Sequence, residues 1–361
     1  MMRTNYLSHW SRRLLVFSVC ASLAFVMSSP ALAGADACQS ALALSRQELA
    51  ASFAGNRASV LIAQGSHVLL RASWGAGVSS DTRFLLGSIS KTLQGLVASR
   101  LMVQGKVGLT DRVIDWLPVD SRAGLPEVWS RIRVQELLHH TSGIVDYMNE
   151  LPPSGFLSTP RTFAEIFHRI PPALHFSPES SLSYSNSNYY ILSKVLELRT
   201  GSPYPELYRS ELVQALGLVA TGLEIAPDHS IWGGSGNYPA NMMGVGNSVS
   251  TTNELMKVLT ALDGESFLPR EQVQALFTGS ADCTGGSVCG RYGLGWSLRD
   301  DAIQGRKLVI HEGHLSSVSA VVAKIPDLKL NVAIVSDRGR YLLEAPVTAI
   351  LDRLVSAGCV N

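Results

Sequence analysis

Residues 307–336, KLVIHEGHLSSVSAVVAKIPDLKLNVAIVS, decide the fold of the C-terminal part of the chain. The segment contains three runs rich in β-branched residues, Lys307–His311, Val318–Lys324 and Asn331–Ser336, and short turns separate them. Ile325-Pro326-Asp327 is the clearest of these turns, because proline suits a turn and cannot donate to a sheet. The segment therefore predicts an antiparallel meander.

Two further strand candidates lie near the other end of the chain. Ala58–Gln64 and His67–Ala72 flank Gly65-Ser66, which is a hairpin signal. Between the two strand regions the apolar residues recur at helical spacing, most clearly from Ile89 to Leu101, where the helix is apolar enough to be buried. Other helices are expected at residues 37–54, 134–140, 162–169, 189–199, 205–216, 252–262, 270–277 and 342–354.

This order of elements predicts an α/β (α+β) fold. We expect an antiparallel sheet with terminal helices packed on it, formed by residues 34–90 and 290–361, and a mainly helical inserted domain over residues 91–289. Strands from both ends of the chain would then share one sheet. A cleft between the sheet domain and the helical domain is a common place for a ligand.

The first 33 residues have the pattern of a cleaved secretory signal. Arg3, Arg12 and Arg13 precede the apolar residues 14–27, and Ala31-Leu32-Ala33 predicts cleavage after Ala33. A membrane anchor is the alternative, but this apolar stretch is shorter than the roughly 20 residues that cross a bilayer. We therefore expect a periplasmic or secreted protein with no stable membrane span after signal removal. The twin arginine leaves the export route open.

The composition limits the possible partners. The chain has 361 residues, 46% of them hydrophobic and 16% charged, which is typical of a globular protein and not of a disordered chain. The formal net charge is only +1, so no basic excess exists to bind nucleic acid. We expect a small-molecule or short-peptide substrate as the partner. The oligomeric state does not follow from the sequence.

Four cysteines remain once Cys20 leaves with the signal. In an exported protein this even number suggests two disulfides, and four cysteines allow three pairings. Cys283 and Cys289 flank a glycine-containing loop that can fold back on itself. Our hypothesis pairs these two with each other and Cys38 with Cys359, which would fasten the first helix to the last. Four buried free thiols are the alternative.

The first chemical motif is Ser88-Ile89-Ser90-Lys91, at the start of the buried helix. Three residues are almost one helical turn, so the Ser88 hydroxyl and the Lys91 amine share a face. Burial lowers the pKa of a lysine, which allows it to act as a base toward a serine nucleophile. An N-cap serine followed by an ordinary helical lysine is the structural alternative.

The second motif, Tyr184-Ser185-Asn186, lies in a polar run before a helix. A tyrosine near a cationic lysine can have its pKa lowered and shuttle a proton, and an asparagine can both donate to and accept from a substrate amide. A polar loop that merely caps the helix is the alternative.

The third motif is His311-Glu312-Gly313-His314, in the strand region. A strand beside a cleft can present backbone N–H groups to the oxyanion of an acyl-transfer intermediate, and Gly313 would let the substrate approach closely. Metal binding by the two histidines is the alternative, but the spacing of zinc-binding helices is absent and His139-His140 supplies no clear third ligand. An edge strand with incidental histidines is another. The chain contains no Gly-x-Ser-x-Gly elbow, phosphate-binding loop or dinucleotide fingerprint.

The three motifs in this order resemble those of the penicillin-recognising serine hydrolases. That family comprises class C β-lactamases, DD-carboxypeptidases and related esterases and D-aminopeptidases, and its motifs are Ser-x-x-Lys, Tyr-x-Asn and Lys-Thr-Gly or His-Thr-Gly. The segments Leu137–Gly143 and Tyr292–Trp296 are also similar to family sequences. The resemblance spans nearly the whole chain after the signal and implies a β-lactamase/transpeptidase-like fold.

The resemblance also implies a role for each motif residue. Ser88 would be acylated, Lys91 and Tyr184 would share the proton transfers, and which of them acts first stays open. The remaining roles concern the substrate: Asn186 would hold its amide, the backbone N–H groups of Ser88 and His314 would hold the oxyanion, and His311 would take the place of the third-motif cation. No cofactor is implied. A non-catalytic sensor of cell-wall peptides or penicillin on the same scaffold is the alternative function.

Glu312 departs from the family pattern, which has threonine or serine there. A carboxylate at this position would repel a substrate carboxylate unless it is protonated or turned away. The departure favours substrates without a carboxylate there, such as esters, or substrates that carry an amine, such as peptides with an N-terminal D-residue. Arg291 could restore anion binding if it faces the cleft.

Overall fold

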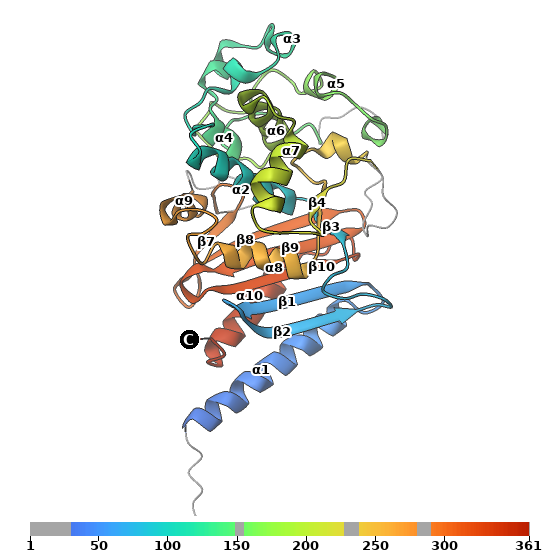
Figure 1. Cartoon of the computed structure of the whole chain (residues 1–361), viewed down its shortest axis with the longest axis vertical. Helices are drawn as coiled ribbons and strands as arrows, with labels where there is room; N and C mark the ends of the chain where they lie inside the picture. Colours follow the sequence, from blue (N-terminus) through green and yellow to red (C-terminus); the bar gives the residue numbers. More distant parts are fainter. Residues whose placement is uncertain (1–29, 149–154, 227–237, 280–289, 361) are drawn as a thin grey trace, which may run out of the picture.

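The computed structural model describes residues 30–148, 155–226, 238–279 and 290–360, and for residues 30–35 it describes the backbone only. Its central element is a seven-stranded sheet in the order β2-β1-β10-β9-β8-β7-β6, in which every neighbouring pair is antiparallel (Figure 1). The strands are β1 (Ala58–Gln64), β2 (His67–Trp74), β6 (Arg291–Tyr292), β7 (Ser297–Ile303), β8 (Arg306–Leu315), β9 (Val318–Ile325) and β10 (Leu330–Ser336).

The predicted meander and the predicted closure of the sheet from both ends are confirmed. Strands β8, β9 and β10 follow one another in the sheet, and β10 pairs with β1 in a register that runs from Ala58 opposite Ser336 to Gln64 opposite Leu330. Strand β8 extends to Leu315, so the whole third motif lies within it. The N-terminal and C-terminal strands therefore depend on each other for their backbone hydrogen bonds.

Both faces of the sheet are covered, because every residue of the central strands β9 and β10 is buried. In β9, Val318, Ala320 and Val322 belong to one hydrophobic cluster, whereas Val321 and Ala323 belong to the other. This is the alternation that strand geometry dictates. Helices α1 (Pro30–Ser52) and α10 (Glu344–Ser356) cover the second of these faces, at the lower end of the molecule in Figure 1.

A disulfide between Cys38 and Cys359 joins the first and last helical regions, as we expected, with the two Cα atoms 4.9 Å apart. The predicted partner bond between Cys283 and Cys289 lies outside the described residues. The same holds for most of the predicted signal, residues 1–29. Helix α1 begins at Pro30 and not at residue 37, because the alanine-rich segment before Cys38 also favours a helix.

The other face of the sheet carries the helical part of the chain. Its elements are α2 (Ile89–Val103), η1 (Val113–Trp116), α3 (Val119–Arg122), η2 (Glu127–Arg131), α4 (Val134–Leu138), η3 (Phe156–Ser158), α5 (Phe163–Phe167), α6 (Asn186–Thr200), α7 (Tyr204–Tyr208), η4 (Arg209–Gln214), η5 (Pro239–Met242), α8 (Thr252–Ala261) and α9 (Arg270–Leu276). A short turn, η6 (Pro326–Leu328), joins β9 to β10. The helix expected over 205–216 is divided into α7 and the wider turn η4.

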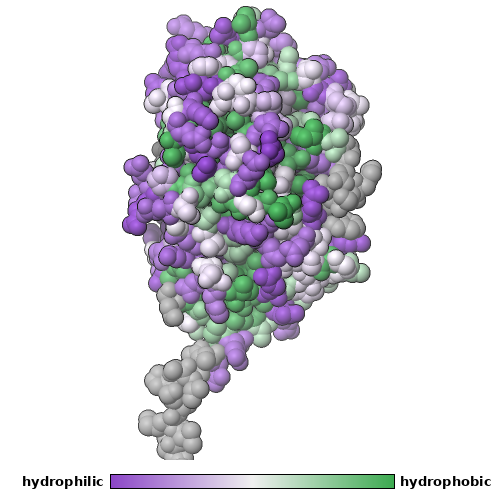
Figure 2. Space-filling model, viewed as in Figure 1, coloured by the Kyte–Doolittle hydropathy of each residue, from purple (hydrophilic) through white to green (hydrophobic). Residues whose placement is uncertain are grey.

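Helix α8 packs directly on β10 and β1, although the predicted boundaries place it in the inserted domain. Leu255, Val258 and Leu259 are buried on its inner side, so this amphipathic helix completes the sheet layer. Those boundaries, at residues 90/91 and 289/290, stay a prediction. In Figure 2, hydrophobic side chains reach the surface at about the level where the helical elements meet the sheet.

A small sheet in the order β3-β5-β4 lies between the large sheet and the helices. It consists of β3 (Phe84–Leu85), β4 (Gly222–Leu223) and β5 (Ser248–Ser250). Strand β3 directly precedes α2 in the chain. Among the described residues no helix is both long and apolar enough to cross a membrane.

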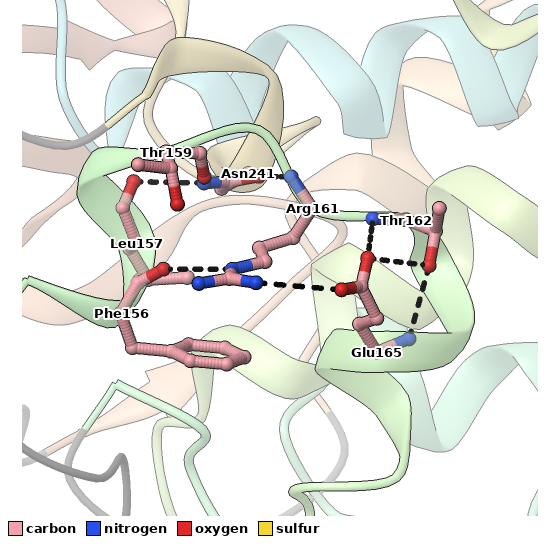
Figure 3. Close-up of polar contacts among 7 residues, drawn as sticks. All are labelled: Phe156, Leu157, Thr159, Arg161, Thr162, Glu165 and Asn241. Atoms are coloured by element: carbon pink, nitrogen blue, oxygen red, sulfur yellow. Dashed lines mark hydrogen bonds and ion pairs between the residues drawn. The ribbon is translucent and has the colours of Figure 1, made fainter.

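Turn η5 is held in place by Asn241, whose amide nitrogen donates to the backbone oxygens of Leu157 (2.7 Å) and Thr159 (2.8 Å) (Figure 3). Its amide oxygen accepts the N–H of Arg161 at 2.9 Å. Glu165 completes the same corner by accepting both the N–H and the hydroxyl of Thr162, which is a helix-capping arrangement. The corner fixes the segment that leads from η5 to Val245.

Candidate active site

Ser88 lies in the turn that leads from β3 into α2. The N–H of Leu86 donates to Ser248 O (2.9 Å), and the Ser90 hydroxyl accepts the N–H of Ser248 (2.9 Å), so both sides of the turn are tied to β5. Ser88 is the N-cap residue of α2, as the alternative held, but its hydroxyl makes no capping bond to a backbone N–H of the helix. The hydroxyl is therefore available to side-chain partners.

Lys91 lies one turn further along α2 and is completely buried. Its Nζ atom lies 3.1 Å from Ser88 Oγ, 2.8 Å from Asn186 Oδ1 and 3.1 Å from Val245 O. The amide and carbonyl oxygens can only accept hydrogen bonds, whereas a serine hydroxyl can also donate. A neutral Lys91 would use its two hydrogens on Asn186 and Val245, and its lone pair would then face the Ser88 hydroxyl.

The environment of Lys91 favours that neutral form. Burial lowers its pKa from 10.5 to about 7, and the negative charge of Asp146 opposes part of this change. Asp146 reaches Lys91 through Asn186, whose Nδ2 donates to Asp146 Oδ2 at 2.8 Å. This contact orients the asparagine amide with its oxygen toward Lys91. Sequence reasoning missed Asp146, because it follows the Leu137–Gly143 segment in an irregular loop.

Tyr184 enters the site from the other side. The Lys91 Nζ atom lies 4.9 Å from the centre of its ring, and the tyrosine hydroxyl makes no hydrogen bond of normal length and angle with a described residue. We expected the lysine to lower the pKa of Tyr184. Instead burial raises it, and the nearby Ser88 hydroxyl lowers it only in part, so this expectation is wrong. The phenol stays protonated at neutral pH because desolvation disfavours the phenolate.

The loop that carries Tyr184 is fixed by His140, a second residue to which sequence reasoning gave no site role. The Ser185 N–H donates to His140 Nδ1 (3.2 Å), and the Asn188 amide lies 3.1 Å from the same nitrogen. The His140 ring centre is 4.4 Å from that of Tyr184, and burial lowers the pKa of the imidazole. A neutral imidazole therefore supports the back of the Tyr184 ring. His140 also has a positive φ of 60°, which is uncommon outside glycine.

His311 is buried and uncharged. Its Nδ1 atom lies 2.8 Å from Glu312 O, which can only accept, so Nδ1 carries the hydrogen and Nε2 accepts from the Tyr292 hydroxyl (2.8 Å). Burial, with a smaller contribution from the charge of Lys91, lowers the pKa of His311 to about 3. His311 therefore lies at the third-motif position without a positive charge near pH 7, because burial disfavours the protonated imidazole.

Gly313 brings strand β8 against the Ser88 turn. A Cβ atom at Gly313 would lie 1.8 Å from Leu86 O and 3.2 Å from Ser88 N, and one at Gly87 would lie 2.9 Å from His314 N. The expected reason for this glycine, close approach of the substrate, is corrected: the approaching group is the protein's own backbone. The N–H groups of Ser88 and His314 thus belong to two segments in direct contact.

Glu312 is turned away from Ser88 toward the start of α10. Its Oε1 atom accepts the N–H of Glu344 (2.9 Å) and that of Leu343, so the carboxylate lies at the positive end of the helix. His314 Nε2 lies 3.1 Å from Tyr341 O, in the same region. Arg291, which we considered for anion binding, donates to Gly279 O at 2.8 Å and pairs with Asp300, away from the motif residues.

Five of the predicted residues line one cavity of about 220 Å³. Its walls are formed by Ser88, Tyr184, Ser297, Arg299, Ile310, His311, Glu312, His314, Leu342 and Glu344. Lys91 and Asn186 lie behind Ser88 and contact it or each other. A larger groove of about 800 Å³ between α8 and the β1–β2 hairpin contains none of the motif residues. Within the described ranges no group of three or more metal-binding side chains gathers.

Comparison with known proteins gives a consistent result. The family model described as beta-lactamase matches residues 48–357. The chain is 24% identical over 314 residues to penicillin-binding protein 4* of Bacillus subtilis (strain 168), which is 77% of this chain and 67% of that protein. It is 25% identical over 183 residues to a putative D-alanyl-D-alanine carboxypeptidase of Escherichia coli (strain K12), and this match spans 45% of the chain but only 42% of the relative. A D-stereospecific amidohydrolase from Streptomyces sp. has a similar structure, with a TM-score of 0.70, 23% identity, and coverage of 84% of this chain and 94% of that one.

Proposed function

The chain belongs to the beta-lactamase family, a family of serine hydrolases, and we propose that it is an exported enzyme that cleaves an ester, amide or lactam through an acyl-enzyme on Ser88. One observation carries the proposal: the buried Lys91 amine contacts Ser88 Oγ while two obligate acceptors occupy its other positions. The disulfide between Cys38 and Cys359 and the predicted signal support export, because such bonds persist in oxidising compartments.

Acylation begins at Ser88. Its oxygen attacks the substrate carbonyl carbon while its proton passes to the lone pair of Lys91, whose lowered pKa suits a base near neutral pH. We assign this first proton to Lys91 and not to Tyr184, since the raised pKa of the phenol leaves no phenolate at that pH. The oxyanion forms beside the adjacent backbone N–H groups of Ser88 and His314.

Tyr184 then acts as the acid. Tyr184 lines the cavity, its hydroxyl lies near that of Ser88, and we assign to it the proton that passes to the leaving group as the tetrahedral intermediate collapses. The proton held by Lys91 restores the phenol. Water hydrolyses the ester on Ser88 by the same transfers in reverse. Lys91 and Asp146 hold the amide oxygen and one N–H of Asn186, and its expected contact with the substrate amide stays a prediction, because Asn186 lies behind Ser88 and not among the lining residues of the cavity.

Similar proteins narrow the class of substrate. The chain resembles a penicillin-binding protein, a putative D-alanyl-D-alanine carboxypeptidase and a D-stereospecific amidohydrolase. Acyl groups with D-configuration are therefore our first choice, as peptides or simple amides. Short-chain esters and β-lactams stay within the proposal because they react by the same acyl transfer.

Active-site labelling tests the proposal. A fluorescent fluorophosphonate or penicillin should label the wild type, and Ser88→Ala should abolish the labelling. Ser180→Ala is the matched control, because that exposed hydroxyl donates only to Ser177 O and lies outside the cavity. Equal labelling of Ser88→Ala and wild type would remove Ser88 as the nucleophile. A panel of nitrocefin, a nitrophenyl ester, a D-Ala-D-Ala peptide and a D-amino-acid anilide then ranks the substrates, and no turnover of any would favour the non-catalytic sensor.

A further inference from the structure

One cation lines the cavity of Ser88, and the protein itself neutralises it. Among the lining residues of the described chain, Arg299 is the only lysine or arginine. Its Nε donates to Glu344 Oε1 at 2.7 Å and its Nη2 donates to Glu344 Oε2 at 3.1 Å. This two-pronged geometry is the one that a guanidinium offers to any carboxylate. Glu344 also lines the cavity, so the pair faces the same space as the nucleophile.

The two partners reach the pair from well-fixed elements. Arg299 lies on β7, and its Nη1 donates to Leu298 O at 3.3 Å. Glu344 is the first residue of α10, and its N–H is bound by Glu312. The side chains are 21% and 32% exposed, so the pair is open to a ligand in the cavity. An incoming carboxylate would have to displace Glu344 and leave it beside Glu312 without its cation.

We propose that Glu344 is a specificity-determining residue that occupies Arg299 in place of a substrate carboxylate. The described wall of the cavity then carries the two carboxylates of Glu312 and Glu344 and the guanidinium of Arg299; His311 is neutral, and His314 Nε2 lies 3.7 Å from Glu312 Oε1. This balance disfavours a substrate with a carboxylate on its leaving group and accepts neutral or cationic groups there. The inference rests on the proposed acyl transfer at Ser88 and names its substrate class.

The test uses two esters of the same N-acylglycine that differ in one group. The leaving group is m-carboxyphenol in one and m-carbamoylphenol in the other, and the measured quantity is the ratio of their kcat/KM values. Glu344→Gln removes the charge and keeps the shape, so Arg299 becomes available to the substrate carboxylate. We expect the ratio of carboxylate to carboxamide ester to rise about 10-fold or more, as a charge-assisted contact is gained. Glu344→Ala should give a rise in the same direction.

Two controls isolate the cause. The double variant Arg299→Gln/Glu344→Gln should lose the gain, because no guanidinium is left to bind the carboxylate. Glu48→Gln removes the other two-pronged glutamate–arginine pair of α10, with Arg353 (2.8 and 2.9 Å), and should leave the ratio unchanged. Glu344→Gln with normal labelling of Ser88 but an unchanged ratio would overturn the inference.

Failure of the proposed function would look different. A wild-type protein that is neither labelled at Ser88 nor active on either ester contradicts the acyl transfer itself. In that case calorimetry measures the affinities of benzoate and benzamide, which compares a carboxylate with a carboxamide without requiring turnover. An increase in benzoate affinity in Glu344→Gln alone would support the masked guanidinium, and equal affinities in wild type and variant would refute it.

Discussion

Asp146→Asn should move the acidic limb of the pH–rate profile to lower pH. Lys91 has a pKa of about 7 and must be neutral to accept the Ser88 proton, so kcat/KM should rise as the pH passes through that value. The charge of Asp146 stabilises the protonated amine and raises this pKa. Its removal leaves burial unopposed, and the neutral base then exists at lower pH.

The size of the shift follows from the geometry. Two hydrogen bonds of 2.8 Å through the Asn186 amide join the two charged groups. This places them within about 8 Å of each other, where unit charges interact by about 2 kcal/mol at an effective dielectric constant near 20. One pKa unit corresponds to about 1.4 kcal/mol, so complete loss of the interaction is worth about 1.5 units. Because Asp146 is only partly buried, solvent screening reduces this, and we expect a shift of about 0.5 to 1 unit.

The assay is kcat/KM for a neutral nitrophenyl ester between pH 5 and 9, with thermal unfolding to verify that the variant is folded. A neutral ester keeps the substrate charge constant over this range. Asp115→Asn is the control, because Asp115 is exposed and forms its ion pair with Arg112. The acidic limb of the pH–rate profile of this variant should not move. An unmoved limb in folded Asp146→Asn, or a limb moved to higher pH, would refute the reasoning.

Three further predictions concern the scaffold. Cys38→Ser should lower the free energy of unfolding by about 2 to 4 kcal/mol, because the disulfide closes a loop of 321 residues, and it should leave the rate of substrate hydrolysis at 25 °C unchanged. Denaturant unfolding with and without a reductant measures this change. An unaffected midpoint of unfolding would contradict the prediction. Glu312→Gln weakens the N-terminal cap of α10 and should cost about 1 kcal/mol in the same assay, whereas Glu271→Gln on α9 should cost less. Gly313→Ala should reduce kcat by at least about 10-fold, since its Cβ would lie 1.8 Å from Leu86 O and displace the oxyanion site; wild-type kcat in this variant would remove the close packing as a requirement.

Local patterns predicted much of the fold. The runs rich in β-branched residues within 307–336 indicated strands, and the short turns between them indicated antiparallel neighbours, as β8, β9 and β10 confirm. Where a pattern depended on tertiary packing it was less accurate. The helix expected over residues 205–216 is divided into α7 and η4, and α8 packs on the sheet through contacts with strands far away in the chain, which no local pattern contains.

The site divides in the same way. Ser88 and Lys91 lie one helical turn apart, so their proximity is a property of the helix and is visible in the sequence. Asp146 and Val245 contact the same network from irregular loops, where no periodicity predicts position. His140 lies in the segment Leu137–Gly143, which is similar to family sequences, but its contact with the Tyr184 ring depends on how two loops that are distant in the sequence pack together.

The sequence alone determined which groups can react and how the sheet is threaded, because residue chemistry and strand or helix periodicity are local properties. The tertiary structure decided the protonation states of those groups and the orientation of their side chains. Burial depends on neighbours from the whole chain, and it raised the pKa of Tyr184, neutralised His311 and lowered the pKa of Lys91. The orientation of Glu312 depends likewise on the start of α10, some thirty residues away, whose N–H groups hold this carboxylate in the wall of the cavity.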